Sequence, residues 1–333
     1  MSIIDLGKIG IGPMSSEIIE AAFRYSEINK KPLMLIPSKN QIDWDRGYVN
    51  NWTTENFMSY IASMKNIYPR SNIFICRDHC GPGFKNNKLR DVYHTLETDI
   101  ELGFNLIHVD FSNFSNIHNE ILLESKKAIE FIVKKNSKIL IEIGTDKNRA
   151  GVTNDFSKIK KEIKFFTSFV PIKFYVVRTG SLVKEINQIG KFNLNFISKV
   201  KKIVEKESVL LKEHNGDYLS EDEILARRGI IDAINIAPQF GVLQTHTILE
   251  KCITYGIDYS DFLNQSYESK RWKKWSDNSI GRNRFLCSLI AGHYLFTSDS
   301  YKRVYDRLNK HTNIKEDIIA EVMKSISNYV DNP

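Results

Sequence analysis

The 333-residue sequence contains no stretch close to the roughly 18 consecutive apolar residues that a membrane-spanning helix needs. Its N-terminus, MSIIDLGKIGIG, lacks the basic segment and following apolar segment of a secretory signal peptide. We therefore expect a cytoplasmic protein with no membrane partner. A composition of 42% apolar and 26% charged residues, with a mean hydropathy of -0.32, is typical of a globular chain and argues against disorder.

Cysteine is scarce, and the four cysteines are too widely spaced for a disulfide framework. Only Cys76 and Cys80 lie near each other, and no second pair could complete a structural zinc site. Because side chains alternate along a strand, Cys76 would face one side while the following loop carries Cys80 away. We expect reduced thiols in the core rather than a zinc or redox site.

Nucleotide-binding fingerprints are also missing. The sequence has no P-loop, and GIG at residues 10–12 lacks the third glycine of a dinucleotide site, which excludes a nicotinamide cofactor. Short glycine turns that could present backbone N–H groups to a phosphate occur at residues 81–83 (GPG), 144–146 (GTD) and 178–181 (RTGS). Arg178 and Lys212 could add positive charge to such a site.

The net charge of +7 and the isoelectric point near 9.0 raise the question of nucleic-acid binding. The lysines, however, are spread through amphipathic segments such as KIKKEIKFF, a pattern typical of solvated helix faces. The densest basic and aromatic cluster is SKRWKKW at residues 269–275, which could meet a phosphate or a partner surface. No nucleic-acid-binding motif accompanies it, so we expect no nucleic-acid partner. A phosphorylated small substrate would suit a basic site equally well.

Short apolar runs recur along the chain, and each is followed by a segment with helical periodicity. The runs cover residues 9–14, 33–40, 72–79, 105–112, 138–145, 172–180, 209–217 and 231–239. This alternation predicts a parallel sheet with crossover helices. Eight units favour a TIM (β/α)8 barrel, with a doubly wound open sheet as the alternative. We expect a barrel core over residues 1–260 and a C-terminal helical segment, 261–333, that completes the barrel or packs on it.

Barrel enzymes place their chemistry at the carboxyl ends of the strands, and these ends are polar in almost every predicted unit. The candidates for substrate binding are Asn40, Gln41, Asp110, Arg178, Ser181, Lys212 and Asn235. His108 and Thr179 belong to the same polar rim.

Two histidines at different strand ends, His79 and His214, could hold a divalent cation together with nearby carboxylates. Zinc prefers such nitrogen and oxygen ligands, and a catalytic site keeps one position open for substrate. Asp78, beside a metal ligand, would be a suitable general acid and base. Glu142, on a neighbouring strand, is the second candidate for a catalytic carboxylate. The alternative is that both histidines only cap strand ends through hydrogen bonds.

Several segments, in order, resemble one known family. They are LIPSKNQIDWDRGYVNNWTTENF, RDHCGP, GFNLIHVDFS, LLKEHNGDYLS and INIAPQFG. Together they are similar to the motifs of the Z-type subunit family of tagatose 1,6-bisphosphate aldolase, which is related to the class II fructose bisphosphate aldolases. The resemblance spans roughly residues 9–245 and implies a TIM barrel.

The resemblance implies a divalent metal, usually zinc, with manganese or cobalt as alternatives. Residue by residue, it matches Asp78 to an acid and base aspartate, His79 and His214 to metal ligands, and Glu142 to an acidic strand end. Asn235 matches a substrate-binding asparagine. The related aldolases take a third ligand histidine from a segment that here reads YVVRTGS. The third ligand is therefore expected to be Glu142, Asp110, water or nothing.

The family's implied activity is retro-aldol and aldol chemistry at C3 and C4 of a ketose phosphate. It would give either cleavage or 4-epimerisation of the fructose 6-phosphate and tagatose 6-phosphate type. Other members are regarded as accessory subunits that stabilise a separate catalytic aldolase chain, so an aldolase subunit or a second copy of this chain is an expected partner.

Overall fold

The computed structural model describes residues 5–145, 155–276 and 278–331. Asp146 of the predicted GTD turn lies outside these ranges. Eight parallel strands close into a barrel, with the first strand paired to both the second and the last. They are β1 (Ile9–Ile11), β2 (Leu33–Leu35), β3 (Ile73–Cys80), β4 (Leu106–Val109), β5 (Leu140–Gly144), β6 (Ile172–Val176), β9 (Leu210–Glu213) and β10 (Ala233–Ile236). The predicted TIM barrel is confirmed, and a closed ring of strands excludes the open sheet.

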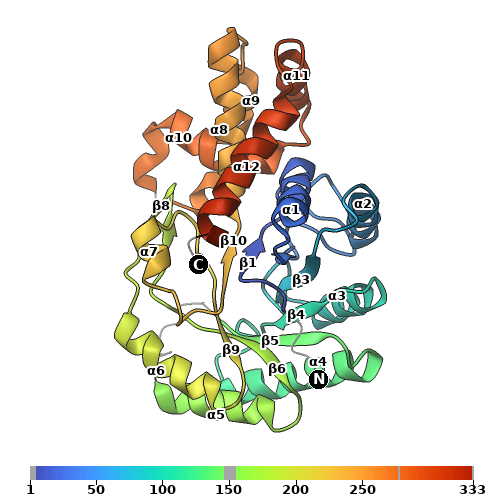
Figure 1. Ribbon diagram of the computed structural model, residues 1–333, viewed down its shortest axis with the longest axis vertical. Coiled ribbons are helices and arrows are strands. Elements are labelled where there is room, and N and C mark those ends of the chain that lie inside the picture. Colours follow the sequence, from blue (N-terminus) through green and yellow to red (C-terminus); the bar gives the residue numbers. More distant parts are fainter. Residues whose placement is uncertain (1–4, 146–154, 277, 332–333) are drawn as a thin grey trace.

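In chain order, each barrel strand except β6 is followed by a helix on the outside of the barrel (Figure 1). These helices are α1 (Ser16–Asn29), α2 (Thr54–Ile67), α3 (Leu89–Glu101), α4 (His118–Lys135), α5 (Phe156–Thr167), α7 (Glu221–Leu225) and α8 (Pro238–Tyr255). After β6 the chain first forms a small hairpin, β7 (Val183–Lys184) and β8 (Asn187–Gln188), and then α6 (Leu194–Glu205).

Local sequence explains where the first helices begin. The Ser15 hydroxyl accepts a hydrogen bond from the Ile18 backbone N–H at the start of α1, and Thr53 forms a capping box with Asn56 at the start of α2. Such side-chain oxygens satisfy N–H groups that have no partner within the helix. The starts of α1 and α2 are therefore fixed by the residues next to them in the sequence.

The remaining helices stand above the barrel in Figure 1 and form what we call the C-terminal appendage, residues 260–331. They are α9 (Ser260–Glu268), the 3-10 helix η1 (Arg271–Lys274), η2 (Asn278–Arg282), α10 (Arg284–Ala291), η3 (Gly292–Leu295), α11 (Asp299–Leu308) and α12 (Ile314–Asp331). The last of these packs against both α1 and α8, so the appendage folds back onto the barrel wall. The exact boundary predicted at residue 260 stays a prediction. No helix among the described residues has the length and apolar content to cross a membrane.

The barrel interior changes from apolar to polar along the strands. Leu106, Cys76 and Phe174 belong to one buried apolar cluster. Two positions after Leu106 lies His108, paired in register with Glu142 of the next strand. Because side chains two apart share a face of a strand, His108 points to the same interior as Leu106. The carboxyl ends of the strands therefore bring buried polar groups together at one end of the barrel.

Candidate metal centre

The end of β3 departs from regular strand geometry where Asp78 and His79 lie. The register with β4 shifts between Arg77 and Cys80, and His79 has a left-handed backbone, with φ of 45°. In a regular strand two successive side chains point to opposite faces. The irregularity lets both Asp78 and His79 face the open end of the barrel, where they line the same cleft.

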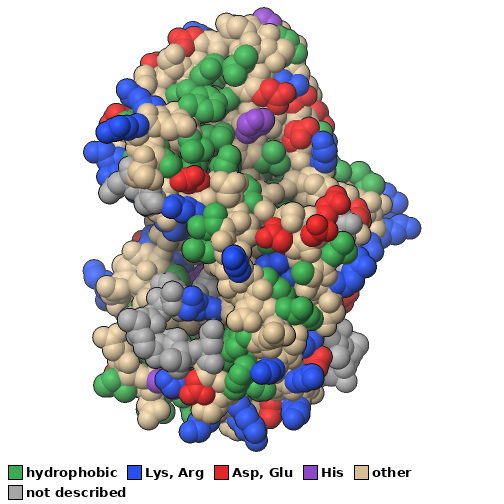
Figure 2. All heavy atoms as spheres, turned by 90° about the vertical axis from the view of Figure 1, so that its left-hand side faces the viewer, with side chains coloured by type: hydrophobic (Ala, Val, Ile, Leu, Met, Phe, Trp, Pro, Cys, Tyr) green, Lys and Arg blue, Asp and Glu red, His purple; other side chains and the backbone are tan. Residues whose placement is uncertain are grey.

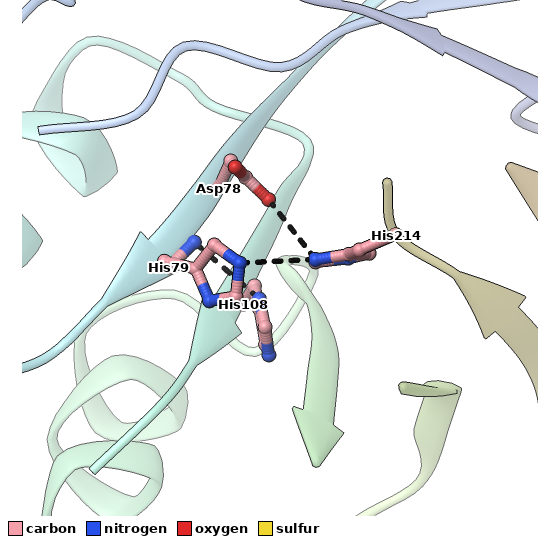
Figure 3. Close-up of side chains that lie close together, drawn as sticks. All are labelled: Asp78, His79, His108 and His214. Atoms are coloured by element: carbon pink, nitrogen blue, oxygen red, sulfur yellow. Dashed lines mark hydrogen bonds and ion pairs between the residues drawn. The ribbon is translucent and has the colours of Figure 1, made fainter. Parts of the chain in front are cut away.

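Four side chains converge there from three parts of the barrel (Figure 3). Asp78 and His79 come from β3, His108 comes from β4, and His214 follows β9. One potential ligand atom from each lies within 4.8 Å of those of the other three. His108 and His214 are buried, whereas Asp78 and His79 are partly exposed. The cluster therefore has a buried side and a side open to the cleft.

Each of the first two histidines has one ring nitrogen held by an acceptor outside the cluster. Nδ1 of His79 lies 2.8 Å from Oδ2 of Asp110, and Nε2 of His108 lies 2.9 Å from the carbonyl oxygen of Gly144. A carbonyl oxygen only accepts hydrogen bonds, so Nε2 of His108 carries the proton. Nδ1 of His108 is then an acceptor, and it receives the His79 backbone N–H at 3.3 Å.

The third histidine is held in the same way. Nε2 of His214 lies 3.0 Å from Oε1 of Glu142, whose other oxygen accepts a hydrogen bond from Nζ of Lys212 at 2.7 Å. Burial raises the pKa of Glu142, but the opposing effect of Lys212 and the two histidines is larger and holds that pKa well below its usual range. Ionised Glu142 therefore fixes the proton of His214 on Nε2.

The pKa of Asp110 is lowered in the same way as that of Glu142. Burial raises its pKa, but the hydrogen bond from His79 and the nearby His108 ring hold the pKa well below its usual range. With protons on the outer nitrogens, Nε2 of His79 and Nδ1 of His214 face each other at 3.0 Å as two electron-pair donors. Two such electron-pair donors at that distance repel each other unless a proton or a metal ion lies between them. Outer-shell acceptors of this kind are the usual companions of metal-bound histidine.

The donor set fits a divalent transition metal. Three imidazole nitrogens and one carboxylate oxygen are ligands that zinc takes, and manganese and cobalt also accept nitrogen and oxygen donors. Cys76 and Cys80 are not part of the cluster. Both are buried free thiols, and burial raises the pKa of each to about 12, as expected for core cysteines.

A cleft of about 610 Å³ opens over the cluster. Among the predicted substrate-binding residues, Asn40, Gln41 and Asn235 line it. Nδ2 of Asn235 also donates a hydrogen bond to Oδ1 of Asp78 at 3.2 Å. The opposite wall belongs to the C-terminal appendage and includes Lys270, Arg271, Lys274, Trp275 and Tyr294.

Other predicted site residues lie elsewhere. Glu142, Lys212 and Asp110 are buried beneath the histidines, so they support the cluster and do not line the cleft. Arg178 and Ser181 follow β6 and are absent from the cleft wall as far as the described residues define it. The Ser181 hydroxyl is instead bonded to the buried Glu213 and Arg227 pair.

Two features of the site go beyond the sequence-based predictions. His108 belongs to the predicted polar rim but not to the predicted metal ligands, although it lies in the segment GFNLIHVDFS, on the strand next to that of His79. The segment 269–275 is visibly basic in the sequence, but nothing local in the sequence predicts that it faces the cleft.

Comparison with solved structures places this geometry among known proteins. A Sinorhizobium meliloti protein named a "probable tagatose 6 phosphate kinase" matches with a TM-score of 0.81 at 14% identity, over 98% of this chain and 100% of its own. The fructose-bisphosphate aldolase of Campylobacter jejuni matches with a TM-score of 0.55 at 12% identity, over 91% of this chain and 90% of its own. This chain shares the fold of these proteins.

A further match extends the comparison to an isomerising enzyme. The fructuronate-tagaturonate epimerase UxaE of Cohnella laeviribosi has a TM-score of 0.65 at 12% identity, over 98% of this chain and 81% of its own. No family model matches the sequence. At these identities the shared property is the barrel fold, which agrees with the fold implied by the sequence resemblance.

Proposed function

We propose that the protein is a divalent-metal-dependent enzyme that performs retro-aldol and aldol chemistry at C3 and C4 of a ketose phosphate. The favoured outcome is 4-epimerisation of the fructose 6-phosphate and tagatose 6-phosphate type, with aldol cleavage as the other outcome of the same chemistry. The observation that supports it most directly is the cluster of Asp78 with three histidines, each oriented by a separate outer acceptor.

His79 and His214 would hold the ion in this proposal, through the nitrogens that face each other. His108 would join them once its Nδ1 gives up the 3.3 Å hydrogen bond from the His79 backbone N–H. A bound divalent ion supplies a Lewis acid that polarises the ketose carbonyl and stabilises the negative charge that develops as the C3–C4 bond breaks. Zinc is the favoured ion because most of the ligands are imidazoles.

Asp78 would take the proton from the 4-hydroxyl group of the substrate. The C4–O electrons then form the aldehyde carbonyl, and the C3–C4 bonding pair moves toward the C2 carbonyl. Rotation of the aldehyde and addition to its other face re-form the bond, and Asp78 returns the proton to the C4 oxygen. Asn235 would orient Asp78 for both transfers, since it donates to the carboxylate.

The shape of the cleft favours epimerisation over release of the fragments. The barrel forms one wall and the appendage the other, so a cleaved aldehyde would be held between them while it turns. Exclusion of water and retention of the fragment are what separate inversion from cleavage. The name of the S. meliloti protein supports a tagatose phosphate as ligand, and the name of UxaE supports an epimerisation.

The test is the variant Asp78→Asn, with Asp45→Asn as a control on a more exposed loop carboxylate. Turnover of fructose 6-phosphate and tagatose 6-phosphate would be followed by NMR for C4 epimers and for cleavage products, with metal content measured on the same samples. We expect Asp78→Asn to lose activity by about a thousandfold or more while the three histidines keep the metal bound.

Full activity in Asp78→Asn would overturn the assigned role of Asp78. A wild-type protein with no stoichiometric metal, and no activity on any ketose phosphate with added zinc, manganese or cobalt, would favour the accessory-subunit alternative instead.

A further inference from the structure

The short 3-10 helix η1 presents two cations to the cleft. Trp272 is buried at its centre, where the indole Nε1–H donates to the backbone oxygen of Tyr267 at 3.0 Å and the ring joins an apolar cluster with Cys287. A 3-10 helix has three residues per turn, so Arg271 and Lys274 lie on the same face. Both line the cleft, whereas Lys273 does not and lies over the Trp272 ring.

The guanidinium of Arg271 lies against one aromatic ring, which is itself fixed by its neighbours. The guanidinium carbon lies 5.4 Å from the centre of the Tyr294 ring. The Tyr294 hydroxyl accepts a hydrogen bond from Trp275 Nε1 at 3.1 Å, and the Tyr294 ring packs at 4.8 Å against Tyr48. This packing restricts the guanidinium before any ligand arrives, which lowers the entropy cost of binding.

Two cations on this wall, Lys270 and Arg271, have no carboxylate within 4.0 Å among the residues that the structure describes. Figure 2 shows Lys and Arg side chains gathered beside the hollow on this face of the molecule. An anionic group entering the cleft would therefore meet Lys270, Arg271 and Lys274 together.

The position where a barrel of this kind usually binds phosphate is already filled. That position is formed by loops after the last strands and by a helix N-terminus. Here the N-terminus of α8 follows β10 directly, and the backbone N–H groups of Ala237 and Gln239 donate to Oδ1 of Asp217 at 3.0 and 2.8 Å. Asp217 is 2% exposed, so its own carboxylate occupies these donors.

We propose that Lys270, Arg271 and Lys274 of the appendage bind the phosphate group of the substrate, in place of the α8 N-terminus. The proposal rests on the proposed function for the identity of the sugar, but the anion site itself follows from the cleft wall. The planar guanidinium of Arg271 offers paired N–H donors to phosphate oxygens, and the two lysines add charge. Selectivity for phosphorylated over free ketoses is thus a property of the appendage, and the barrel supplies the reacting groups.

The experiment is a calorimetric titration of the purified, metal-containing protein with inorganic phosphate. Wild type is compared with Arg271→Ala, Lys274→Ala and the control Lys273→Ala, which removes the same charge from the same helix outside the cleft. We expect each cleft variant to bind phosphate about tenfold more weakly, the double variant about a hundredfold, and Lys273→Ala within twofold of wild type. Circular dichroism checks that these exposed substitutions leave the fold intact.

Failure of this proposal is separable from failure of the proposed function. The titration needs no turnover, and Asp78→Asn should bind phosphate as wild type does. Two results would overturn the phosphate site even if ketoses are epimerised. One is no phosphate binding by wild type, and the other is equal binding by wild type and the double variant of Arg271→Ala with Lys274→Ala. If the double variant loses phosphate binding but wild type turns over no ketose, the phosphate site is supported and the proposed ketose reaction is rejected.

Discussion

The ring nitrogen Nε2 of His214 lies 3.0 Å from Oε1 of the buried Glu142. This contact decides which nitrogen of His214 faces the other histidines, because the ionised carboxylate holds the ring proton on the outer side. Lys212 sets the charge of Glu142 in turn, through its hydrogen bond to Oε2. Lys212 does not line the cleft, yet through Glu142 it influences which ring nitrogen of His214 carries the proton.

Replacement of Glu142 with Gln should lower metal affinity by about 10- to 100-fold, since loss of an outer-shell partner has that effect on histidine ligands. It should also destabilise the fold by about 3–5 kcal/mol, because Lys212 keeps its charge in a buried position without a partner. Competition with a chelating dye measures the affinity, and urea unfolding measures the stability.

The matched control for Glu142→Gln is Glu213→Gln. Glu213 lies on β9, next to Lys212 in the sequence. Glu213 is also a buried carboxylate with a cationic partner, Arg227, but strand alternation turns it away from the cluster. We expect Glu213→Gln to lose stability without losing metal affinity. Equal metal affinity in Glu142→Gln and wild type would show that Glu142 does not orient His214.

Gly10 leaves space for the side chain that contacts Asp78. A Cβ atom at Gly10 would lie 2.3 Å from Oδ1 of Asn235, closer than real contacts allow. Gly10→Ala should displace Asn235 and break its hydrogen bond to Asp78, and we expect turnover to fall by about 10- to 100-fold with metal content unchanged. Turnover and metal content would be measured on the same preparation.

Gly281→Ala is the control for this substitution, since its Cβ would meet only Trp272, at the ordinary distance of 3.4 Å. Wild-type turnover in Gly10→Ala would mean that Asn235 is not needed to position Asp78.

Glu162, on α5, gives the fold a pH dependence. Burial raises its pKa from 4.5 to about 7, against the opposing hydrogen bond from Tyr175. Folded protein therefore binds a proton between pH 4.5 and 7 that unfolded protein does not, so this stability is complete below pH 4.5 and lost as pH rises through 7. At about 1.4 kcal/mol per pKa unit the full shift would correspond to about 3 kcal/mol. Because the Glu162 side chain keeps some exposure to solvent, we expect a loss of about 2 kcal/mol.

Urea unfolding of wild type and Glu162→Gln at pH 5 and pH 8 tests this expectation, because the variant lacks the titrating group. Tyr175→Phe, which removes the opposing hydrogen bond, should move the loss to higher pH. Parallel stability curves for wild type and Glu162→Gln would contradict the assignment.

Much of the fold follows from local sequence. Each apolar run of six to nine residues is bounded by turn residues and followed by a segment with helical periodicity, so the eight strands can be located without tertiary information. Ser15 and Thr53 mark helix starts by satisfying backbone N–H groups within three residues. The position of Asp78 and His79 at the end of β3 is equally a local property.

The set of residues that form the site can be predicted from the sequence only in part. A strand pattern shows which residues point inward, but not which inward residues meet across a closed ring. His108 joins the cluster because β4 lies beside β3 in the barrel and the register brings its ring to the depth of Glu142. Lys212 has the charge of a phosphate ligand, yet its depth in the barrel pairs it with Glu142 instead.

The sequence by itself determined the number and order of the barrel strands, because these depend on periodicity. It also determined the reduced state of the buried cysteines and the acid and histidine pair at residues 78 and 79, because these depend on nearest neighbours. Only the tertiary structure decided that His108 completes the cluster, and that Arg271 and Lys274 face it from the appendage. Those contacts join residues far apart in the chain, and they exist only because the barrel closes and the last helices pack back over its open end.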